Sequence, residues 1–200
     1  MKKKDNSIQA PMGETKVLLH TCCAPCSSAI IEALMNNGIT PVIYYCNPNI
    51  FPKEEYEIRK NECTRYAESL GLEIVDADYD HENWLESVKG LEGEPERGGR
   101  CLKCFKLRLL RTAEYARQRG MKVITTTLAS SRWKSLDQIN EAGVWACDTV
   151  SSGNMDDTVL WWDQNWRKGG LQERRLQIIK EYDFYNQLYC GCEFSMRKED

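Results

Sequence analysis

Short apolar runs alternate along the chain with longer segments in which apolar residues recur every three or four positions. The apolar runs have the length of buried β-strands and cover residues 16–21, 40–46, 72–79 and 122–128. The segments between them have helical spacing and cover residues 24–38, 53–71, 101–120 and 135–147, with a shorter helical piece at 81–90. Because strands and helices alternate, the pattern predicts an α/β fold in which a parallel sheet is flanked by helices.

The two ends of the chain depart from this alternation. Residues 1–15 are mostly polar, and we expect a flexible N-terminal segment ahead of one domain that spans residues 16–200. Residues 91–100 are polar and rich in glycine, which is typical of a loop. Residues 151–200 are rich in aromatic side chains, and we expect them to form a helical and irregular cap over the site. Its tryptophans fit the core slightly better than a stacking surface for nucleic-acid bases, and they are Trp161, Trp162 and Trp166.

Composition limits the classes of function. The chain has 200 residues, 42% of them hydrophobic and 28% charged, and its formal net charge is −3. An acidic chain can bind nucleic acid only through a local basic patch. No apolar stretch has the length of a membrane span, and no apolar core of a signal peptide follows the first lysines. We therefore expect a cytoplasmic protein without membrane contact, in which the ten cysteines serve metal or redox chemistry rather than structural disulfides.

Unusual residues gather where the predicted strands end. The first strand runs into HTCCAPC, the second into CNPNIFP, the third into DADYDH and the fourth into TTTLASSRWKS. In an open parallel sheet the carboxyl ends of the strands meet along one edge, where ligands bind. The sequence therefore predicts a functional site along this edge.

Two cysteine pairs lie where helices are predicted to begin. Cys22 and Cys23 separate the first strand from the first helix, and Cys101 and Cys104 open the helix 101–120 with C-x-x-C spacing. The positive end of a helix dipole favours thiolates. Brought together, the two pairs would form a four-thiolate cage that suits zinc or an iron–sulfur cluster. Adjacent cysteines are unusual for a zinc ribbon, but the spacing leaves both metals open.

A third cysteine group, Cys190 and Cys192, has a single glycine between its members. This spacing allows a strained, redox-active disulfide, a further pair of metal ligands, or two buried thiols. We expect the remaining cysteines to be structural. Cys26 would pack inward from the first turn of a helix, and the others would lie in the core or at the surface, namely Cys46, Cys63 and Cys147.

Charged residues and a histidine complete the predicted edge. Asp76, Asp78 and Asp80 alternate after the third strand and could supply a proton or an oxygen ligand, although solvated carboxylates explain them equally. His20 lies in a buried strand and is expected to be a core histidine with hydrogen-bond partners. A basic set flanks the cysteines and is predicted to hold phosphates, unless it is a solvated helix face: Arg97, Arg100, Lys103, Lys106, Arg132 and Lys134.

Taken in order, the segments HTCCAPCS, NPNIFPKEEYEIRK, RCLKCFKLRL, TTTLASSRWKS and YCGCEFS resemble the QueH family of epoxyqueuosine reductases. The resemblance implies a fold similar to adenine-nucleotide α-hydrolase-like domains. It also implies the reduction of epoxyqueuosine to queuosine at the wobble position of tRNA anticodons. The implied site residues are Cys190 and Cys192 as a redox-active pair and four ligands of a 4Fe–4S cluster, namely Cys22, Cys23, Cys101 and Cys104.

The implied reaction consumes two electrons and two protons and releases the epoxide oxygen as water. A 4Fe–4S cluster transfers single electrons, so we expect a second redox element, either the dithiol pair or an additional iron that could also bind the epoxide oxygen. Asp78 or Asp80 could donate a proton. Without a clear dinucleotide fingerprint, the chain should depend on an external electron donor. Two alternatives stay open: a zinc-stabilised RNA-binding module without redox activity, and a thiol-based tRNA sulfur-transfer enzyme.

Overall fold

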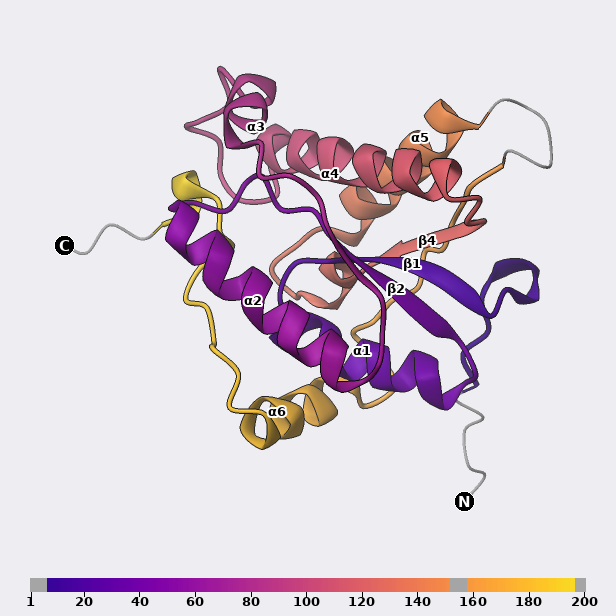
Figure 1. Ribbon diagram of the computed structural model, residues 1–200. Helices are drawn as coiled ribbons and strands as arrows, with labels where there is room; N and C mark the ends of the chain where they lie inside the picture. Colours follow the sequence, from indigo (N-terminus) through magenta and orange to yellow (C-terminus); the bar gives the residue numbers. More distant parts are fainter. Residues whose placement is uncertain (1–6, 152–157, 197–200) are drawn as a thin grey trace.

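A five-stranded parallel sheet forms the centre of the molecule (Figure 1). The computed structural model describes residues 7–151 and 158–196, and the strand order is β3-β2-β1-β4-β5. In chain order the strands are β1 (Lys16–Thr21), β2 (Thr40–Tyr45), β3 (Ile74–Asp76), β4 (Val123–Thr126) and β5 (Leu160–Trp161). The central strand β1 pairs in parallel with both neighbours, and its Leu19 lies opposite Ile43 of β2 and Thr125 of β4. The predicted α/β fold is confirmed.

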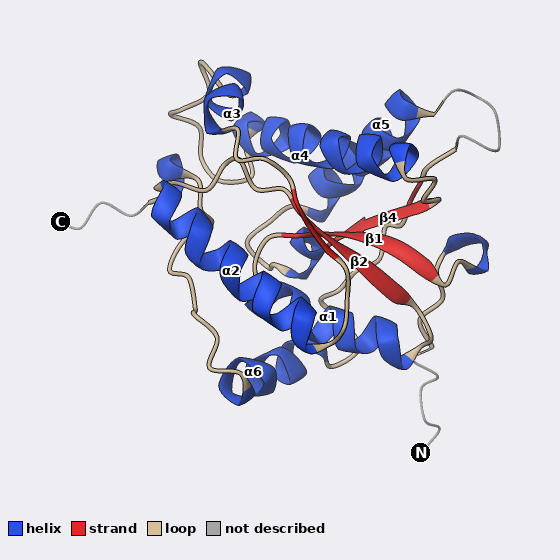
Figure 2. Cartoon of the chain, in the orientation of Figure 1, coloured by secondary structure: helices blue, strands red, loops and turns tan. Residues whose placement is uncertain are grey.

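Helices cover both faces of the sheet (Figure 2). On one face lie α1 (Ala24–Asn36), α2 (Lys53–Ser69) and α6 (Leu171–Glu181); on the other lie α4 (Gly99–Gln118) and α5 (Leu136–Val150), with α3 (His81–Ser87) against α4. Side chains of a strand alternate between the faces, so Val17 and Leu19 of β1 join the core beneath α1 and α2 while Leu18 joins the core beneath α4 and α5. Both faces of a parallel sheet are thereby buried.

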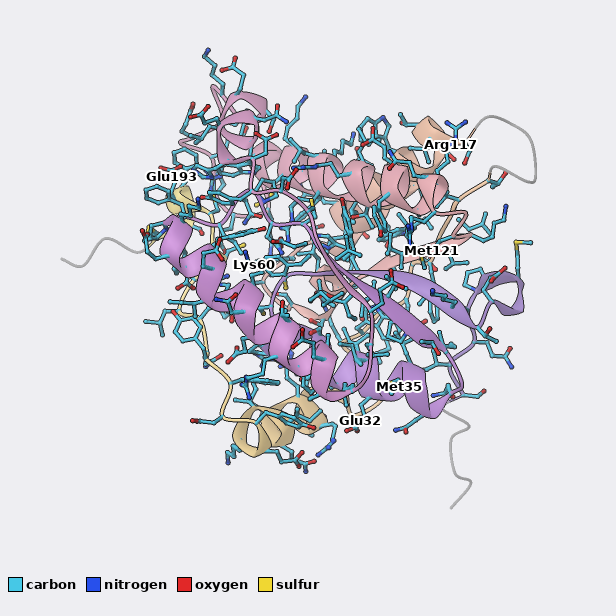
Figure 3. The ribbon with its side chains drawn as sticks, viewed as in Figure 1. Glu32, Met35, Lys60, Arg117, Met121 and Glu193 are labelled. Atoms are coloured by element: carbon cyan, nitrogen blue, oxygen red, sulfur yellow. The ribbon has the colours of Figure 1, made fainter. Side chains whose placement is uncertain are left out.

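The C-terminal part contains the helix α6 and irregular structure, as predicted, and it also adds a strand. The two-residue β5 pairs with β4, and α6 packs against α1. After α6 the chain runs along α2 to a short 3-10 turn at Glu193–Ser195, where Glu193 Oε1 lies 3.2 Å from His81 Nε2 (Figure 3). Trp162 and Trp166 are buried, which confirms their expected place in the core.

The N-terminal segment expected to be flexible divides into two parts. Residues 1–6 lie outside the described residues. From there the backbone N–H of Ile8 donates to Asn37 Oδ1 at 3.0 Å, and Ala10 is buried. Within the two described stretches, no helix combines the length and the apolar character needed to cross a membrane.

Gly143 allows α5 to approach β5 closely. A Cβ atom at this position would overlap the indole ring of Trp161, whose Nε1 donates to Asn140 Oδ1 at 3.2 Å. Alanine normally stabilises a helix interior relative to glycine by roughly 0.5–1 kcal/mol. Here we expect Gly143→Ala instead to lower the free energy of unfolding by about 1–3 kcal/mol, because overpacking forces the ring to move.

Urea unfolding of the full chain measures this effect. Val144→Ala changes the exposed neighbour on the same helix and serves as the control, with an expected change within about 0.5 kcal/mol. A Gly143→Ala protein as stable as the wild type would show that α5 and β5 do not pack as described.

Candidate active site

The first cysteine group lies at the point where the strand order reverses. From β1 the chain moves outward to β2 and β3, then returns to β4 and β5 on the other side of β1. Open α/β sheets bind ligands in the crevice at such a switch point. Here the Cys22 N–H donates to Thr127 Oγ1 at 3.2 Å, and the Thr127 hydroxyl donates to Cys22 Sγ at 3.4 Å. The ends of β1 and β4 therefore meet as the sequence predicts.

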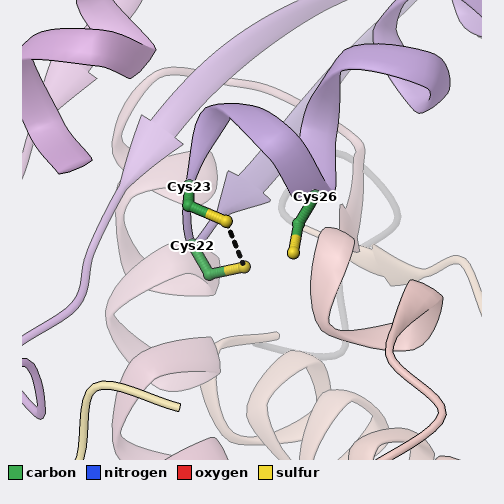
Figure 4. A group of neighbouring side chains, drawn as sticks. All are labelled: Cys22, Cys23 and Cys26. Atoms are coloured by element: carbon green, nitrogen blue, oxygen red, sulfur yellow. Dashed lines mark hydrogen bonds between the residues drawn. The ribbon is translucent and has the colours of Figure 1, made fainter. Parts of the chain in front are cut away.

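Three sulfurs gather at this point (Figure 4). The Sγ atoms of Cys22, Cys23 and Cys26 lie within 4.8 Å of one another, and those of Cys22 and Cys23 are 3.9 Å apart. Cys23 is the N-cap of α1 and Cys26 lies in its first turn, so both thiols project from the same end of the helix. The prediction that Cys26 packs into the core is wrong. Its signal was available, because CAPC has the same C-x-x-C spacing as CLKC.

The three thiols differ in pKa. Hydrogen bonds from the Cys23 and Cys26 thiols lower the pKa of Cys22 well below its usual range, with further help from Thr127 and Arg108. Burial raises the pKa of Cys23, and the hydrogen bond to Cys22 raises that of Cys26 to about 12. Within this cluster Cys22 is therefore the thiol that ionises most readily. Gln187 Nε2 also donates to Cys23 Sγ at 3.0 Å, which ties the C-terminal segment to it.

Cys101 and Cys104 lie outside this three-sulfur cluster. They occupy the first turns of α4, where the Arg97 N–H donates to Cys101 Sγ at 3.3 Å and Arg108 Nη1 donates to Cys104 Sγ at 3.9 Å. Together with Cys190 and Cys192 they line a narrow recess of about 30 Å³. The structure therefore brings the second cysteine group directly to the third, whereas the first group lies in a neighbouring cavity.

Lys134 contacts Cys190 and lowers the pKa of its thiol. Its Nζ donates to Cys190 Sγ at 3.0 Å. Burial raises the pKa of the Cys190 thiol, but the Lys134 ammonium and the Arg108 guanidinium outweigh burial, so the net pKa is lowered. Burial and the nearby Cys104 raise the pKa of Cys192 to about 12. Both thiols are free, and their pKa values are shifted in opposite directions, so the Cys190 thiol ionises more readily than the Cys192 thiol.

The backbone around Gly191 holds this pair in place. Gly191 has φ of 108°, and a Cβ atom there would lie 2.8 Å from Ile50 Cγ1, so the position requires glycine. Its carbonyl accepts from the Phe51 N–H at 2.9 Å. The buried Arg59, which pairs with Glu55, donates to the carbonyls of Tyr189 and Cys190 at 3.3 and 3.4 Å. Sequence reasoning missed Arg59, because nothing in an ordinary Glu-x-x-x-Arg helix pattern indicates a partner 131 residues away.

A cavity of about 720 Å³ opens beside Cys22, Cys26 and Cys190. This volume lies within the range of small-molecule sites and suffices for a nucleoside. Glu96 is the only carboxylate among the described lining residues, whereas the cations there are Arg59, Arg108, Arg132, Lys134 and Arg175. The cavity therefore favours an anionic or electron-rich ligand close to two of the cysteine groups.

The predicted phosphate-binding set is only partly free to meet a ligand. Lys103 and Arg132 are exposed, and Arg132 lines the cavity. Arg97 is also exposed, but its guanidinium donates to the carbonyls of Arg132 and Trp133 at 2.7 and 3.0 Å. These three side chains are the ones that can face nucleic acid from solvent.

The other three predicted phosphate contacts have partners inside the protein. Arg100 is buried and donates to the carbonyls of the loop that precedes α4, at Leu91, Glu92 and Glu94. Lys106 Nζ lies 2.8 Å from Glu141 Oε1. Lys134 is engaged with Cys190. Of these three, Arg100 and Lys134 line the cavities and Lys106 does not.

The remaining predicted residues lie at the margin of the site. Asp78 is exposed and Asp80 is half-buried at the start of α3, and neither is among the described residues that line the two cavities. His20 confirms the expected core histidine: Nδ1 lies 2.7 Å from Thr126 Oγ1 and Nε2 lies 3.0 Å from the Cys46 carbonyl oxygen. Burial, together with the Arg108 charge, lowers its pKa to about 3, so it stays neutral.

Comparison with known proteins identifies the family. The family model described as epoxyqueuosine reductase QueH matches residues 17–198. Relatives with this same description include proteins of Histophilus somni (48% identical, covering 95% of this chain and 76% of the relative) and Haemophilus influenzae (47%, 95% and 75%). A Thermotoga maritima relative of the same description is 33% identical over 90% of each chain. The chain is therefore an oxidoreductase that belongs to the QueH family of epoxyqueuosine reductases.

Proposed function

We propose that this protein reduces epoxyqueuosine to queuosine in the anticodon loop of tRNA, in the cytoplasm. The observation that carries the proposal is a nucleoside-sized cavity of about 720 Å³ at the sheet's switch point. It is lined by Cys22, Cys26 and Cys190, and Cys190 also lines the recess that holds Cys101 and Cys104. A base of a single-stranded loop can be turned outward into such a pocket at modest energetic cost. Membership of the QueH family supports this substrate.

The reduced pair Cys190 and Cys192 can supply the two electrons that the reaction consumes. As the two sulfurs form a disulfide they release two electrons, both C–O bonds of the epoxide break, and a carbon–carbon double bond forms. The oxygen leaves as water after taking two protons. One proton comes from the Cys192 thiol, whose pKa is about 12, and the other from the Lys134 ammonium beside Cys190. Lys134 thereby takes the role that the sequence assigned to Asp78 or Asp80.

We further propose that Cys22, Cys23, Cys101 and Cys104 hold a 4Fe–4S cluster. The donor set fits, because all four are thiols at the starts of α1 and α4. The buried Arg108 interacts electrostatically with Cys22, Cys104 and Cys190, so one cation is near thiols of all three groups. When bound, the cluster supplies electrons one at a time to this region. An external electron donor must restore the dithiol after each turnover.

Cys26 adds a second way to bind metal. Four thiolates around one ion at a metal–sulfur distance of about 2.3 Å lie roughly 3.8 Å apart. The Cys22–Cys23–Cys26 cluster, with all sulfurs within 4.8 Å, is closer to this single-ion spacing than to ligands on separate irons. A single iron ion held there would take Cys22 and Cys23 from the proposed cluster, so this compact set is an alternative to the four-ligand set rather than an addition to it.

Anaerobic assay of the full chain tests the proposal. We expect the purified protein to contain iron and acid-labile sulfide and, with a chemical reductant, to convert epoxyqueuosine in tRNA to queuosine, seen by mass spectrometry as the loss of one oxygen. The same tRNA incubated with reductant alone is the control. A protein that contains zinc without iron and leaves the nucleoside unchanged would contradict the proposal and favour the zinc-stabilised RNA-binding module.

A further inference from the structure

Trp133 is an exposed tryptophan at the mouth of the cavity. Its exposed fraction of 73% contrasts with 39% for Trp145, Phe51 and Tyr185, the other aromatic side chains exposed to solvent in the described part of the chain. It lines both the large cavity and the recess with Cys101 and Cys104. A large aromatic side chain held in water at a functional cavity is typical of a binding surface.

Hydrogen bonds hold the backbone of Trp133, whereas its indole ring is exposed to solvent. The Trp133 N–H donates to Ser131 Oγ at 3.3 Å, and its carbonyl accepts from Arg97 Nε at 3.0 Å. Gln138 holds Arg97 in turn by donating to the Arg97 carbonyl at 2.8 Å. The ring is therefore presented by an ordered loop, which reduces the entropy lost when a ligand stacks on it.

The position of Trp133 relates it to the reacting nucleoside. The next residue, Lys134, lines both cavities and donates to Cys190 Sγ. The ring therefore stands one residue along the chain from a side chain that contacts the proposed reductant. The exposed Arg132 precedes it, and the exposed Arg97 supports it. An aromatic ring between cations at the rim of a nucleoside-sized cavity combines the two features by which proteins hold single-stranded nucleic acid, base stacking and backbone charge.

We infer that Trp133 is the stacking platform for a nucleobase that neighbours the modified nucleoside in the anticodon loop. This inference rests on the proposed function. While the epoxyqueuosine base occupies the cavity, the adjacent base lies against the indole ring at its mouth and Arg132 meets the phosphate between them. Trp133 acts by positioning the loop, and it takes no part in electron or proton transfer.

Binding of an anticodon stem-loop RNA that contains epoxyqueuosine tests the platform. We expect Trp133→Ala to raise Kd by about 5- to 150-fold, the range for the loss of one stacked base. Trp133→Phe should recover most of the affinity and Trp133→Leu should not, because stacking needs a ring rather than apolar area. Trp145→Ala, a change of an exposed tryptophan outside both cavities, should leave Kd unchanged.

Two further readouts separate positioning from chemistry and from protein docking. With 2-aminopurine placed beside the modified nucleoside, fluorescence should be quenched on binding to the wild type and not to Trp133→Leu. With a chemical reductant, Trp133→Ala should reduce the nucleoside with a raised KM and an unchanged kcat. If Trp133→Ala binds the RNA as tightly as the wild type, the inference is overturned. A defect of Trp133→Ala that is seen only with a protein electron donor also overturns it, because the ring would then be a docking surface for that donor.

The outcomes also distinguish this inference from the proposed function. A wild-type protein that binds the stem-loop in a Trp133-dependent way but does not reduce it contradicts the proposed function and supports the platform. A wild type that reduces the stem-loop, with Trp133→Ala equal to it in Kd and KM, supports the function and overturns the platform.

Discussion

Cys101→Ser and Cys104→Ser are each expected to strip iron and sulfide from the protein and to abolish reduction of epoxyqueuosine. The hydroxyl of serine is a poor substitute for a thiolate that binds an iron–sulfur cluster, and a lost ligand at the start of α4 leaves the cluster open to solvent. Metal and sulfide analysis of anaerobically purified variants measures the first effect, and the tRNA assay measures the second.

Two further variants complete this experiment: Cys63→Ser is a control, and Cys26→Ser tells two possible ligand sets apart. Cys63 lies on the buried face of α2 and should behave as a neutral control for both metal content and activity. Cys26 separates the two ligand sets, because it belongs to the three-sulfur cluster with Cys22 and Cys23 but not to the proposed four-ligand set. Loss of iron from Cys26→Ser together with full iron in Cys101→Ser would replace the proposed set by the compact one.

Cys190→Ser is expected to keep the metal and lose turnover by several orders of magnitude. The substitution leaves Cys192 without a sulfur with which to form a disulfide, so the two electrons that reduce the epoxide have no local source. Iron content and absorption should match those of the wild type. Loss of iron on this substitution would instead make Cys190 a metal ligand and end the redox-pair proposal.

The pH dependence of Cys190 alkylation examines the same residue. The thiolate is the reactive form, and its fraction rises as pH increases through the pKa. The Lys134 ammonium lowers the Cys190 pKa, so Lys134→Met should raise this pKa and move the alkylation curve to higher pH. At a pH below the pKa, each unit by which the pKa rises lowers the thiolate fraction roughly tenfold. Peptide mass spectrometry after brief iodoacetamide treatment measures this, with the exposed Lys89→Met as control. Coincident curves would show that Lys134 does not set the charge of Cys190.

The pattern of apolar residues determined most of the secondary structure. The strand Lys16–Thr21 has the predicted bounds, and α1 and α2 begin at the predicted residues. The two helices could be predicted because each buries a periodic face, and the strand because it is a short apolar run buried on both sides of the sheet. The strand β5 could not, since two residues carry no periodicity and Leu160 becomes a strand residue only by pairing with Val123 of β4. Similarly, α4 begins two residues before Cys101, within a stretch whose glycines indicate a loop.

The sequence by itself also indicated the edge of the sheet on which the candidate site lies, because parallel strands end on one side and the cysteines follow those ends. Only the tertiary structure decided which side chains meet there. Cys26 joins Cys22 and Cys23, and Lys134 contacts Cys190, 56 residues away. Periodicity encodes burial along one element, whereas a contact between distant elements depends on how several elements pack together. Residue type therefore indicated a phosphate ligand at Lys134, and only packing made it the partner of Cys190.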